Sequence, residues 1–274
     1  MKFPDTYFIY SKKRKDIKMF KKILLAAGAL GAAAFGVKAV KNMHKMPLIG
    51  DRAPFFSANT TNGVVNFPCD YKGKWVVFFS HPADFTPVCT TEFMVFEKYY
   101  DKFKKINTEL LGLSVDNLAS HRSWFMSVKD KIKFDGMENT HITFPVIDDE
   151  KGDIARKYGM LQNDTSSTKT VRAVFIVDSD AKVRAILYYP QTTGRNLDEI
   201  LRLVQALQVS DGFDVATPAN WQEGDDVIVP PSKKPFQLSE EELKEQNITC
   251  YDWYLCTKAL SKNEIEDKLK KTEC

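Results

Sequence analysis

A cysteine with the surroundings of a nucleophile, Cys89, lies in the segment 80–92. The apolar run 75–79 before it is typical of a buried strand. The aromatic side chains after it recur at helical spacing, at Phe93, Phe96, Tyr100 and Phe103. We therefore predict a strand-to-helix turn, with Cys89 in the first turn of the helix. Free N–H groups and the positive end of the helix dipole favour the reactive thiolate there.

The polar side chains around Cys89 help to decide between two interpretations of it. A lone cysteine is commonly a small buried hydrophobic residue without chemistry. Here Thr86 precedes Cys89 by three residues, near enough to offer its hydroxyl to the sulfur, and two prolines stiffen the turn. His81 and Glu92 add an imidazole and a carboxylate to the same segment. Packing alone does not require this set, so the pattern favours a reactive thiol.

The spacing Pro82-x-x-x-Thr86-x-x-Cys89 resembles the active-site motif of the peroxiredoxins, and flanking residues extend the match over about a dozen positions. The resemblance implies an α/β, thioredoxin-like fold. It makes Cys89 the peroxidatic cysteine, with Thr86 and Pro82 as catalytic neighbours.

Two arginines later in the chain are candidates to reach this thiol. Arg172 begins an apolar run that reads as a buried strand, where a charge is costly unless it is paired, and a thiolate would pair it. The alternative is an arginine at a strand end that reaches water. The resemblance assigns the thiolate and substrate contact to Arg172 and a second active-site position to Arg195. The predicted substrate-binding set is Arg172, Arg195, His81 and Glu92.

The remaining elements are consistent with a sheet covered by helices on both faces. After the Cys89 helix we predict a strand at 108–115, a helix at 117–131, a strand at 144–147, a helix at 151–158, a hairpin of 171–177 with 183–189, and a helix at 196–208. His121 lies on the second of these helices and is interpreted as solvated or structural. Cys69 lies in a loop and is interpreted as incidental.

Past Gln208 the composition changes to a proline-punctuated segment, an acidic helix at 239–246 and a polar helix at 262–271. This part has too few apolar residues to fold alone, so we expect it to pack on the body or on a partner subunit. The predicted domains are a targeting or anchor segment (1–46), a thioredoxin-like peroxidase domain (47–208) and a small C-terminal dimerisation domain (209–274).

Two cysteines of the C-terminal part, Cys250 and Cys256, are candidates to recycle an oxidised Cys89. A sulfenic acid condenses with a second thiol or over-oxidises, and this pair lies in a tail that looks mobile rather than packed. The tail resembles the peroxiredoxin subfamily with a C-terminal extension, whose prokaryotic members carry a Cys-x5-Cys pair. The resemblance implies that Cys256 bonds Cys89 of the partner subunit and that Cys250 then exchanges with Cys256. It gives Cys274 no role.

The N-terminal residues are basic and contain an apolar run. Residues 1–50 carry a net charge of +9, which leaves −6 for the rest of the chain and disfavours nucleic-acid binding by the folded body. The run 23–37 is short for a membrane span but suits a signal-peptide core. An organellar presequence and an Ala-rich helix packed on the body are the open alternatives. Membrane contact would involve residues 19–40.

Several other activities are excluded by what the sequence lacks. It has no Cys-x-x-Cys pair of the thioredoxin type and no Gly-x-Ser-x-Gly string, so neither disulfide oxidoreductase nor lipase activity is expected. Its four histidines do not pair with cysteines at the spacing of a zinc site. We predict no metal and no cofactor.

The function predicted is that of a thiol-specific peroxidase, which reduces hydrogen peroxide and organic hydroperoxides to water and alcohols through a Cys89 sulfenic acid. The alternatives are a peroxide sensor or redox-regulated chaperone that uses the same cysteine, and a structural module with inert cysteines. The expected partners are a thioredoxin-like or glutathione-like reductant and a second copy of the chain, as a homodimer or a higher oligomer. The resemblance implies a cytoplasmic location unless the N-terminal segment exports, anchors or targets the protein.

Overall fold

A computed structural model describes residues 46–162, 165–166 and 168–270. The predicted targeting segment and its membrane contact at 19–40 lie outside the described residues, as does Cys274. Within the described part, no helix is both long and apolar enough to cross a membrane.

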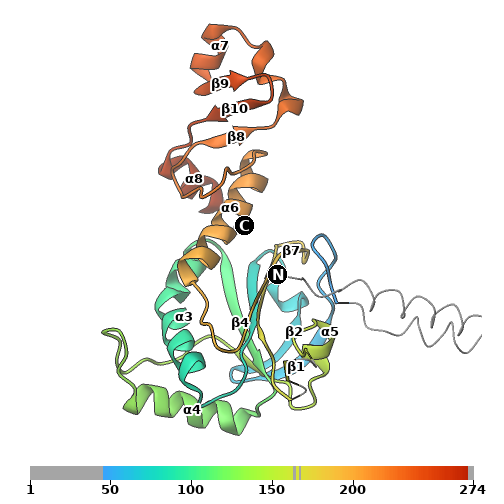
Figure 1. The fold of residues 1–274 in the computed structure, drawn as a ribbon, viewed down its shortest axis with the longest axis vertical. Coiled ribbons are helices and arrows are strands. Elements are labelled where there is room, and N and C mark those ends of the chain that lie inside the picture. Colours follow the sequence, from blue (N-terminus) through green and yellow to red (C-terminus); the bar gives the residue numbers. More distant parts are fainter. Residues whose placement is uncertain (1–45, 163–164, 167, 271–274) are drawn as a thin grey trace, which may run out of the picture. The chain divides into compact units, whose positions relative to one another are not determined.

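A mixed sheet forms the centre of the chain. Its strands are β1 (Phe56–Thr60), β2 (Gly63–Phe67), β3 (Trp75–Ser80), β4 (Thr108–Ser114), β5 (Val146–Asp148), β6 (Arg172–Val177) and β7 (Val183–Tyr189). Their order across the sheet is β2-β1-β5-β4-β3-β6-β7. Figure 1 labels β1, β2, β4 and β7 of this sheet. β4 runs parallel to β3 and to β5, whereas the other neighbouring strands are antiparallel. Thr61 and Asn62 form the turn between β1 and β2.

The sheet is buried on both faces because successive side chains of a strand point to opposite sides. In β3, Val77 and Phe79 enter one apolar cluster, which includes residues of α3 (Pro87–Lys105), α4 (Leu118–Lys131) and α6 (Leu197–Phe213). Val76 and Phe78 enter a second cluster, which includes residues of α5 (Asp153–Lys157). Helices therefore cover both faces, which confirms the predicted thioredoxin-like α/β fold.

Two helices differ in length from their predictions. α5 is a single short helix that begins only at Asp153, where the Asp149 carboxylate accepts hydrogen bonds from the N–H groups of Ile154 and Ala155. α6 continues past Gln208 to Phe213, because its apolar positions Ala206 and Val209 pack against the C-terminal residues. The division of the chain at 46 and 208 stays a prediction, and α6 runs across its second boundary.

The C-terminal residues form a second, small sheet in the order β8-β10-β9, all antiparallel. Its strands are β8 (Val227–Val229), β9 (Ile248–Asp252) and β10 (Leu255–Lys258), accompanied by η2 (Pro231–Lys233), η3 (Pro235–Gln237), α7 (Glu240–Glu245) and α8 (Lys262–Lys270). Ser239 and Glu242 form a capping box at the start of α7. Trp221, Val227, Leu260, Ile265 and Leu269 share an apolar cluster with α6. The second sheet thus belongs to a small domain that has its own apolar residues but draws on α6 to bury them.

Candidate active site

Cys89 occupies the third position of α3, where the sequence places it. The helix begins at Pro87, after Thr86 in extended conformation, and the preceding Phe85 has a positive φ of 54°. Such a backbone is uncommon for a bulky residue, so the turn is held by its surroundings. The Cys89 side chain is completely buried. The thiol therefore lies at the positive end of a helix but under cover, in a turn with unusual backbone geometry.

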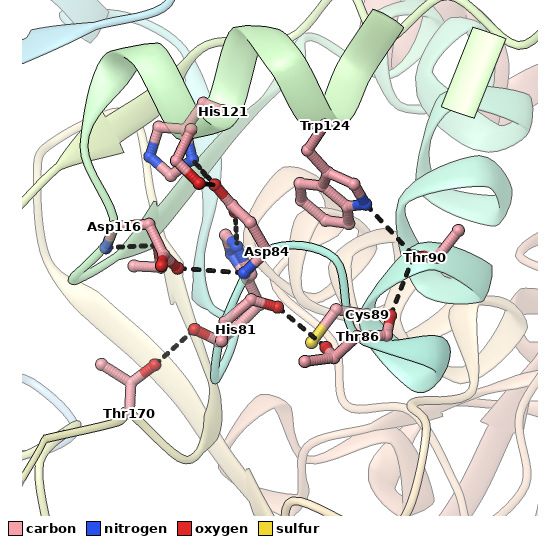
Figure 2. Close-up of polar contacts among 12 residues, drawn as sticks. His81, Asp84, Thr86, Cys89, Thr90, Asp116, His121, Trp124 and Thr170 are labelled. Carbon is pink, nitrogen blue, oxygen red and sulfur yellow. Dashed lines mark hydrogen bonds and ion pairs between the residues drawn. The ribbon is translucent and has the colours of Figure 1, made fainter. Parts of the chain in front are cut away.

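Thr86 and Pro82 shape this turn. The Thr86 hydroxyl donates to the Ala83 carbonyl at 2.8 Å. The structure thus gives this hydroxyl a backbone partner within the turn rather than the Cys89 sulfur. Figure 2 shows the connection to the next helix: the Trp124 indole N–H donates to the Thr90 hydroxyl at 3.1 Å, and that hydroxyl donates to the Thr86 carbonyl at 2.8 Å. Pro82, in the same turn, is buried.

Arg172 reaches the sulfur from β6. Its Nη1 donates to Cys89 Sγ at 3.3 Å and to Glu92 Oε2 at 2.6 Å. Its Nε and Nη2 both donate to the Gln191 carbonyl. The side chain is only 2% exposed, so the alternative of a strand-end arginine that reaches water is wrong. The guanidinium is instead oriented by one carboxylate and one carbonyl, with an N–H directed at the thiol.

Arg195 completes the charge cluster without touching the sulfur. Its Nε donates to Glu92 Oε1 at 2.9 Å and its Nη2 to Oε2 at 2.7 Å. Its backbone N–H also donates to Oε1, and Nη1 donates to the Ser80 and Ala173 carbonyls. Glu92 therefore joins both arginines to the helix that carries Cys89. Two guanidinium groups and one carboxylate leave a buried positive charge, which a thiolate on Cys89 would neutralise.

The ionisation of Glu92 follows from these contacts. Burial alone would raise the pKa of Glu92, but the charge and hydrogen bonds of Arg195, together with the charge of Arg172, outweigh it and hold the pKa below its usual range. The carboxylate consequently stays charged at neutral pH and keeps both guanidinium groups in place.

A second buried cluster, of His81, Asp84 and His121, underlies the turn (Figure 2). Asp84 contacts His81 Nε2 at 2.9 Å and His121 Nδ1 at 2.8 Å, and it accepts the Ser120 hydroxyl at 2.7 Å. Its backbone N–H donates to Asp116. His121 is thus structural rather than solvated, and Asp84 joins the Cys89 turn to the start of α4.

The three groups of this cluster differ in charge. Burial would raise the pKa of Asp84, but the hydrogen bonds and charges of the two histidines hold it well below its usual range. Burial lowers the pKa of His81 below its usual value despite the contact with Asp84. The pKa of His121 shifts in the opposite direction. Burial would lower it, but the hydrogen bond and charge of Asp84 outweigh burial and raise it. An ionised Asp84 accepts only, so His81 donates through Nε2, and its buried Nδ1 is left without a hydrogen-bond partner in the described structure.

The histidine–carboxylate cluster also has the donor types of a metal site, with ligand atoms of His81, Asp84 and His121 within 4.8 Å of one another. However, Asp84 already bonds both imidazoles and the Ser120 hydroxyl. These contacts satisfy the carboxylate from within the protein. The His81 ring is also fixed between Phe93 and Trp124, at centroid distances of 4.6 and 5.3 Å. Its predicted substrate contact stays a prediction.

A cavity of about 390 Å³ opens beside the turn. Its lining includes Phe85, Thr86, Pro87, Thr90 and Trp124. The cavity therefore borders the first turn of α3, the turn that also carries the buried Cys89.

The two C-terminal cysteines are ordered, which corrects the expectation of a mobile tail. Cys250 of β9 and Cys256 of β10 lie opposite each other in the hairpin and form a disulfide with each other. Cross-strand pairing fixes both residues, because β10 is also paired with β8. Cys69 is a free, exposed thiol in η1 (Cys69–Tyr71), in keeping with an incidental residue.

A sulfur that faces an arginine N–H, beside a carboxylate that orders a second arginine, is suited to attack an electrophilic oxygen and to receive the negative charge that develops. On a thioredoxin-like sheet this arrangement defines a thiol-dependent peroxidase.

Comparison with known proteins gives the family. The model of the AhpC/TSA family matches residues 49–186, and that of the C-terminal domain of 1-Cys peroxiredoxin matches residues 206–245. The chain belongs to the peroxiredoxin family, whose members use peroxide substrates and thiol reductants and are typically dimeric.

The similar proteins cover the body of the chain. A peroxiredoxin of Methanosarcina mazei is 56% identical over 214 residues, which are 78% of this chain and 98% of that protein. One of Thermotoga maritima is 50% identical over 218 residues, again 78% of this chain and 98% of that protein. Among solved structures, a yeast mitochondrial 1-Cys peroxiredoxin is 41% identical with a TM-score of 0.67, covering 78% of this chain and 100% of its own.

Two positioning residues escaped the sequence-based prediction, Asp84 and Gln191. Asp84 follows His81 by three residues and lies inside the recognised motif, so the pairing of the two could have been proposed from spacing. Gln191 acts through its backbone carbonyl, which no side-chain pattern reveals.

Proposed function

We propose that the Cys89 thiolate attacks the distal oxygen of hydrogen peroxide or an organic hydroperoxide. The O–O bond breaks, Cys89 becomes a sulfenic acid, and the departing oxygen takes up a proton to leave as water or an alcohol. The observation that carries the proposal is the Arg172 Nη1 donor, 3.3 Å from Sγ and held by Glu92. That N–H can stabilise negative charge on the sulfur before attack and on the leaving oxygen during it.

The other predicted residues have supporting roles in this proposal. Thr86 and Pro82 shape the turn at which the peroxide approaches the sulfur. Glu92 orients Arg172 and balances its charge, and Arg195 holds the Glu92 carboxylate in place. Both residues therefore act on the sulfur through Arg172. His81 follows β3 at the start of the turn, and its buried Nδ1 has no hydrogen-bond partner in the described structure.

For recycling, we propose that the sulfenic acid condenses with Cys256 of a partner subunit and releases water, after which Cys250 attacks Cys256 and frees Cys89. The Cys250–Cys256 disulfide is then the product of this last exchange. Cys89 and Cys256 are both buried, at 0% and 1% exposure, so each must leave its site before they can bond. This fits a homodimer in which residues 209–274 contribute to the contact, with a dithiol or glutathione-like reductant to complete the cycle.

The proposal is tested with single cysteine variants. We expect Cys89→Ser to abolish peroxide consumption, and Cys256→Ser to keep one turnover but lose steady-state turnover with a dithiol reductant. Non-reducing mass spectrometry of Cys250→Ser after one equivalent of peroxide should show Cys89 bonded to Cys256 between two chains, whereas the parent chain should end with the Cys250–Cys256 disulfide, and Cys69→Ser is a control that changes nothing. Undiminished turnover of Cys89→Ser would refute the peroxidase, whereas a Cys89–Cys250 bond in the parent chain would refute the order of resolution.

A further inference from the structure

Another cavity, of about 420 Å³, opens where β3 begins and β6 ends. Cys89 follows the other end of β3, so this cavity does not belong to the site proposed for peroxide attack. Val76 of β3 and Val177 of β6, which are paired in the sheet and each 1% exposed, contribute apolar lining. A cavity of this volume, in which apolar lining is combined with a few polar groups, is typical of a small-molecule site.

Backbone hydrogen bonds hold the segments around this cavity together. The Gly73 N–H donates to the Ser179 carbonyl at 3.2 Å, which joins the segment after η1 to the turn between β6 and β7. The Ala53 N–H donates to the Ala181 carbonyl at 2.8 Å, which joins the N-terminal segment to the same turn. The cavity is therefore built into the fold from three separate segments of the chain.

Charged side chains line the cavity, and three of them have no ion-pair partner among the described residues: Arg52, Lys72 and Asp180. Lys74 and Asp178, which also line it, form ion pairs with other residues. The open charges are therefore two positive and one negative, and all three of these residues are exposed. A ligand that carries more carboxylates than ammonium groups is complementary to this set.

Cys69 adds a thiol to the same cavity. It is free and exposed, and it has no part in the proposed peroxide cycle. A thiolate exchanges with a disulfide when it can reach one of the two sulfurs, and the exposed Cys69 can be reached from solvent. One thiol, two open cations and one open carboxylate together match a small thiol with two carboxylates and one ammonium group. Glutathione carries this set of groups.

We propose that the cavity binds a small acidic thiol of the glutathione type and holds it as a mixed disulfide with Cys69. Arg52 and Lys72 pair with the two carboxylates of the ligand, and Asp180 pairs with its ammonium group. The co-reactant is glutathione disulfide. The Cys69 thiolate attacks one of its sulfurs, the S–S bond breaks, and the electron pair leaves on the other glutathione, which takes up a proton and departs as a thiol. Cys69 is oxidised and one glutathione is reduced, so the number of disulfides is unchanged.

The mixed disulfide has a chemical consequence for a protein that meets peroxide. An exposed thiol can be oxidised stepwise, and its sulfinic and sulfonic products are not restored by thiols, whereas a mixed disulfide is reversible. Occupation of the cavity therefore caps Cys69 until another thiol releases it.

The modification is tested by peptide mapping. The full chain carrying Cys89→Ser is incubated with glutathione disulfide at neutral pH, and the modified peptides are identified by mass spectrometry without reduction. This background removes the buried thiol of the proposed peroxide site, so the result does not depend on the proposed function. We expect one glutathione on Cys69, and the mapping separates this adduct from any on Cys274. A Cys69 that stays unmodified would overturn the proposal.

The role of the cavity is tested by charge. Arg52→Gln and Lys72→Gln should each slow the reaction of Cys69 with glutathione disulfide about threefold, the effect of one exposed ion pair, and together about tenfold. Hydroxyethyl disulfide, which is uncharged, should react with these variants at the parent rate, which also shows that they are folded. Lys129→Gln, at an exposed lysine of α4 that does not line the cavity, is the charge-matched control and should change neither rate.

Two results of this series would overturn the proposal. Equal slowing with both reagents would mean that the cations act on the Cys69 sulfur and not on the ligand. An unchanged rate of the double variant with glutathione disulfide would mean that the cavity makes no use of its charges.

Asp180→Asn separates specific pairing from net charge. It should slow glutathione disulfide about threefold, because the ammonium group loses its partner, but should speed the reaction with dithiodipropionate, which has two carboxylates and no ammonium group. Faster reaction with both reagents would overturn the assignment of Asp180 to the ammonium group.

Discussion

Glu92 shows how a single side chain controls the charge of the site. It accepts from two buried arginines, and the Arg195 guanidinium is also packed over the rings of Phe79 and Phe96, 5.0 and 5.1 Å from their centroids. Desolvation of three charges is costly, and only complete pairing offsets it. Loss of the carboxylate would leave two guanidinium groups buried with a cysteine as their remaining counter-charge.

This pairing predicts a pH-dependent effect of Glu92→Gln. Because the pKa of Glu92 is depressed, its contribution to folding is fully present above the ordinary glutamate value of about 4.3 and is lost as the pH falls through the lower folded value. At pH 7 the variant should lose about 3–5 kcal/mol of unfolding free energy, typical of a broken buried ion pair. The difference from wild type should narrow steadily as urea denaturation is repeated below pH 4.

Glu199→Gln is the matched control, since Glu199 pairs with Arg202 on the surface and should contribute little. A Glu92→Gln deficit that stays constant from pH 7 to pH 3 would contradict the assignment of the depressed pKa to this carboxylate.

Among the secondary-structure elements, the turn between β3 and α3 is held by Asp84. This carboxylate links His81 at the end of β3 to Ser120 and His121 at the start of α4. These contacts hold the turn independently of Arg172. Asp84 therefore positions the first turn of α3, and with it Cys89, without touching the sulfur.

Asp84→Asn should loosen this turn and change the titration of His121. The pair stabilises the fold most between the ordinary values of aspartate and histidine, about 4 and about 6.5. Its contribution is lost as rising pH deprotonates His121 at its raised pKa, or as falling pH protonates Asp84 at its lowered one. We expect a loss of about 3 kcal/mol at pH 6 and a lower pKa for His121, measured by urea denaturation and by NMR titration.

Asp101→Asn serves as the comparison, because Asp101 pairs only with an exposed lysine. If His121 titrates at the same pH in the Asp84→Asn and wild-type chains, the carboxylate is not what raises its pKa.

The predictability of these elements follows from what determines each of them. β3, α3 and β6 were predictable because apolar periodicity and the Pro82–Cys89 motif are local in the sequence. The contact between Asp84 and His121 was not predictable, since these residues are 37 positions apart in the sequence and only the fold brings them together. The paired strands that carry Cys250 and Cys256 were not predicted for a similar reason: β10 is fixed by pairing with β8, and β9 by pairing with β10, and not by an apolar pattern of their own.

In the molecule as a whole, the reacting groups and the recycling groups belong to different sheets. The residues proposed to act on peroxide lie between Ser80 and Arg195, whereas the disulfide lies in the small sheet that shares its apolar cluster with α6. Trp221 is central to that cluster, 1% exposed, and its indole N–H donates to the Asp225 carbonyl at 3.0 Å. A substitution that disrupts this cluster should therefore impair recycling through Cys250 and Cys256 but not the oxidation of Cys89.

Trp221→Ala tests this separation. Removal of the indole leaves a cavity in the small cluster, so we expect a loss of about 3–5 kcal/mol, expressed as faster proteolysis of residues 214–270. The oxidation of Cys89 by one equivalent of peroxide should keep its wild-type rate, because Arg172, Glu92 and Arg195 lie in β6, α3 and the segment before α6, outside this cluster. Steady-state turnover with a dithiol reductant should fall severalfold, because the hairpin with Cys250 and Cys256 is no longer held.

Phe236→Ala, at an exposed aromatic side chain of the same domain, should change neither stability nor rate. Equal slowing of both steps by Trp221→Ala would mean that the small domain also supports the Cys89 site.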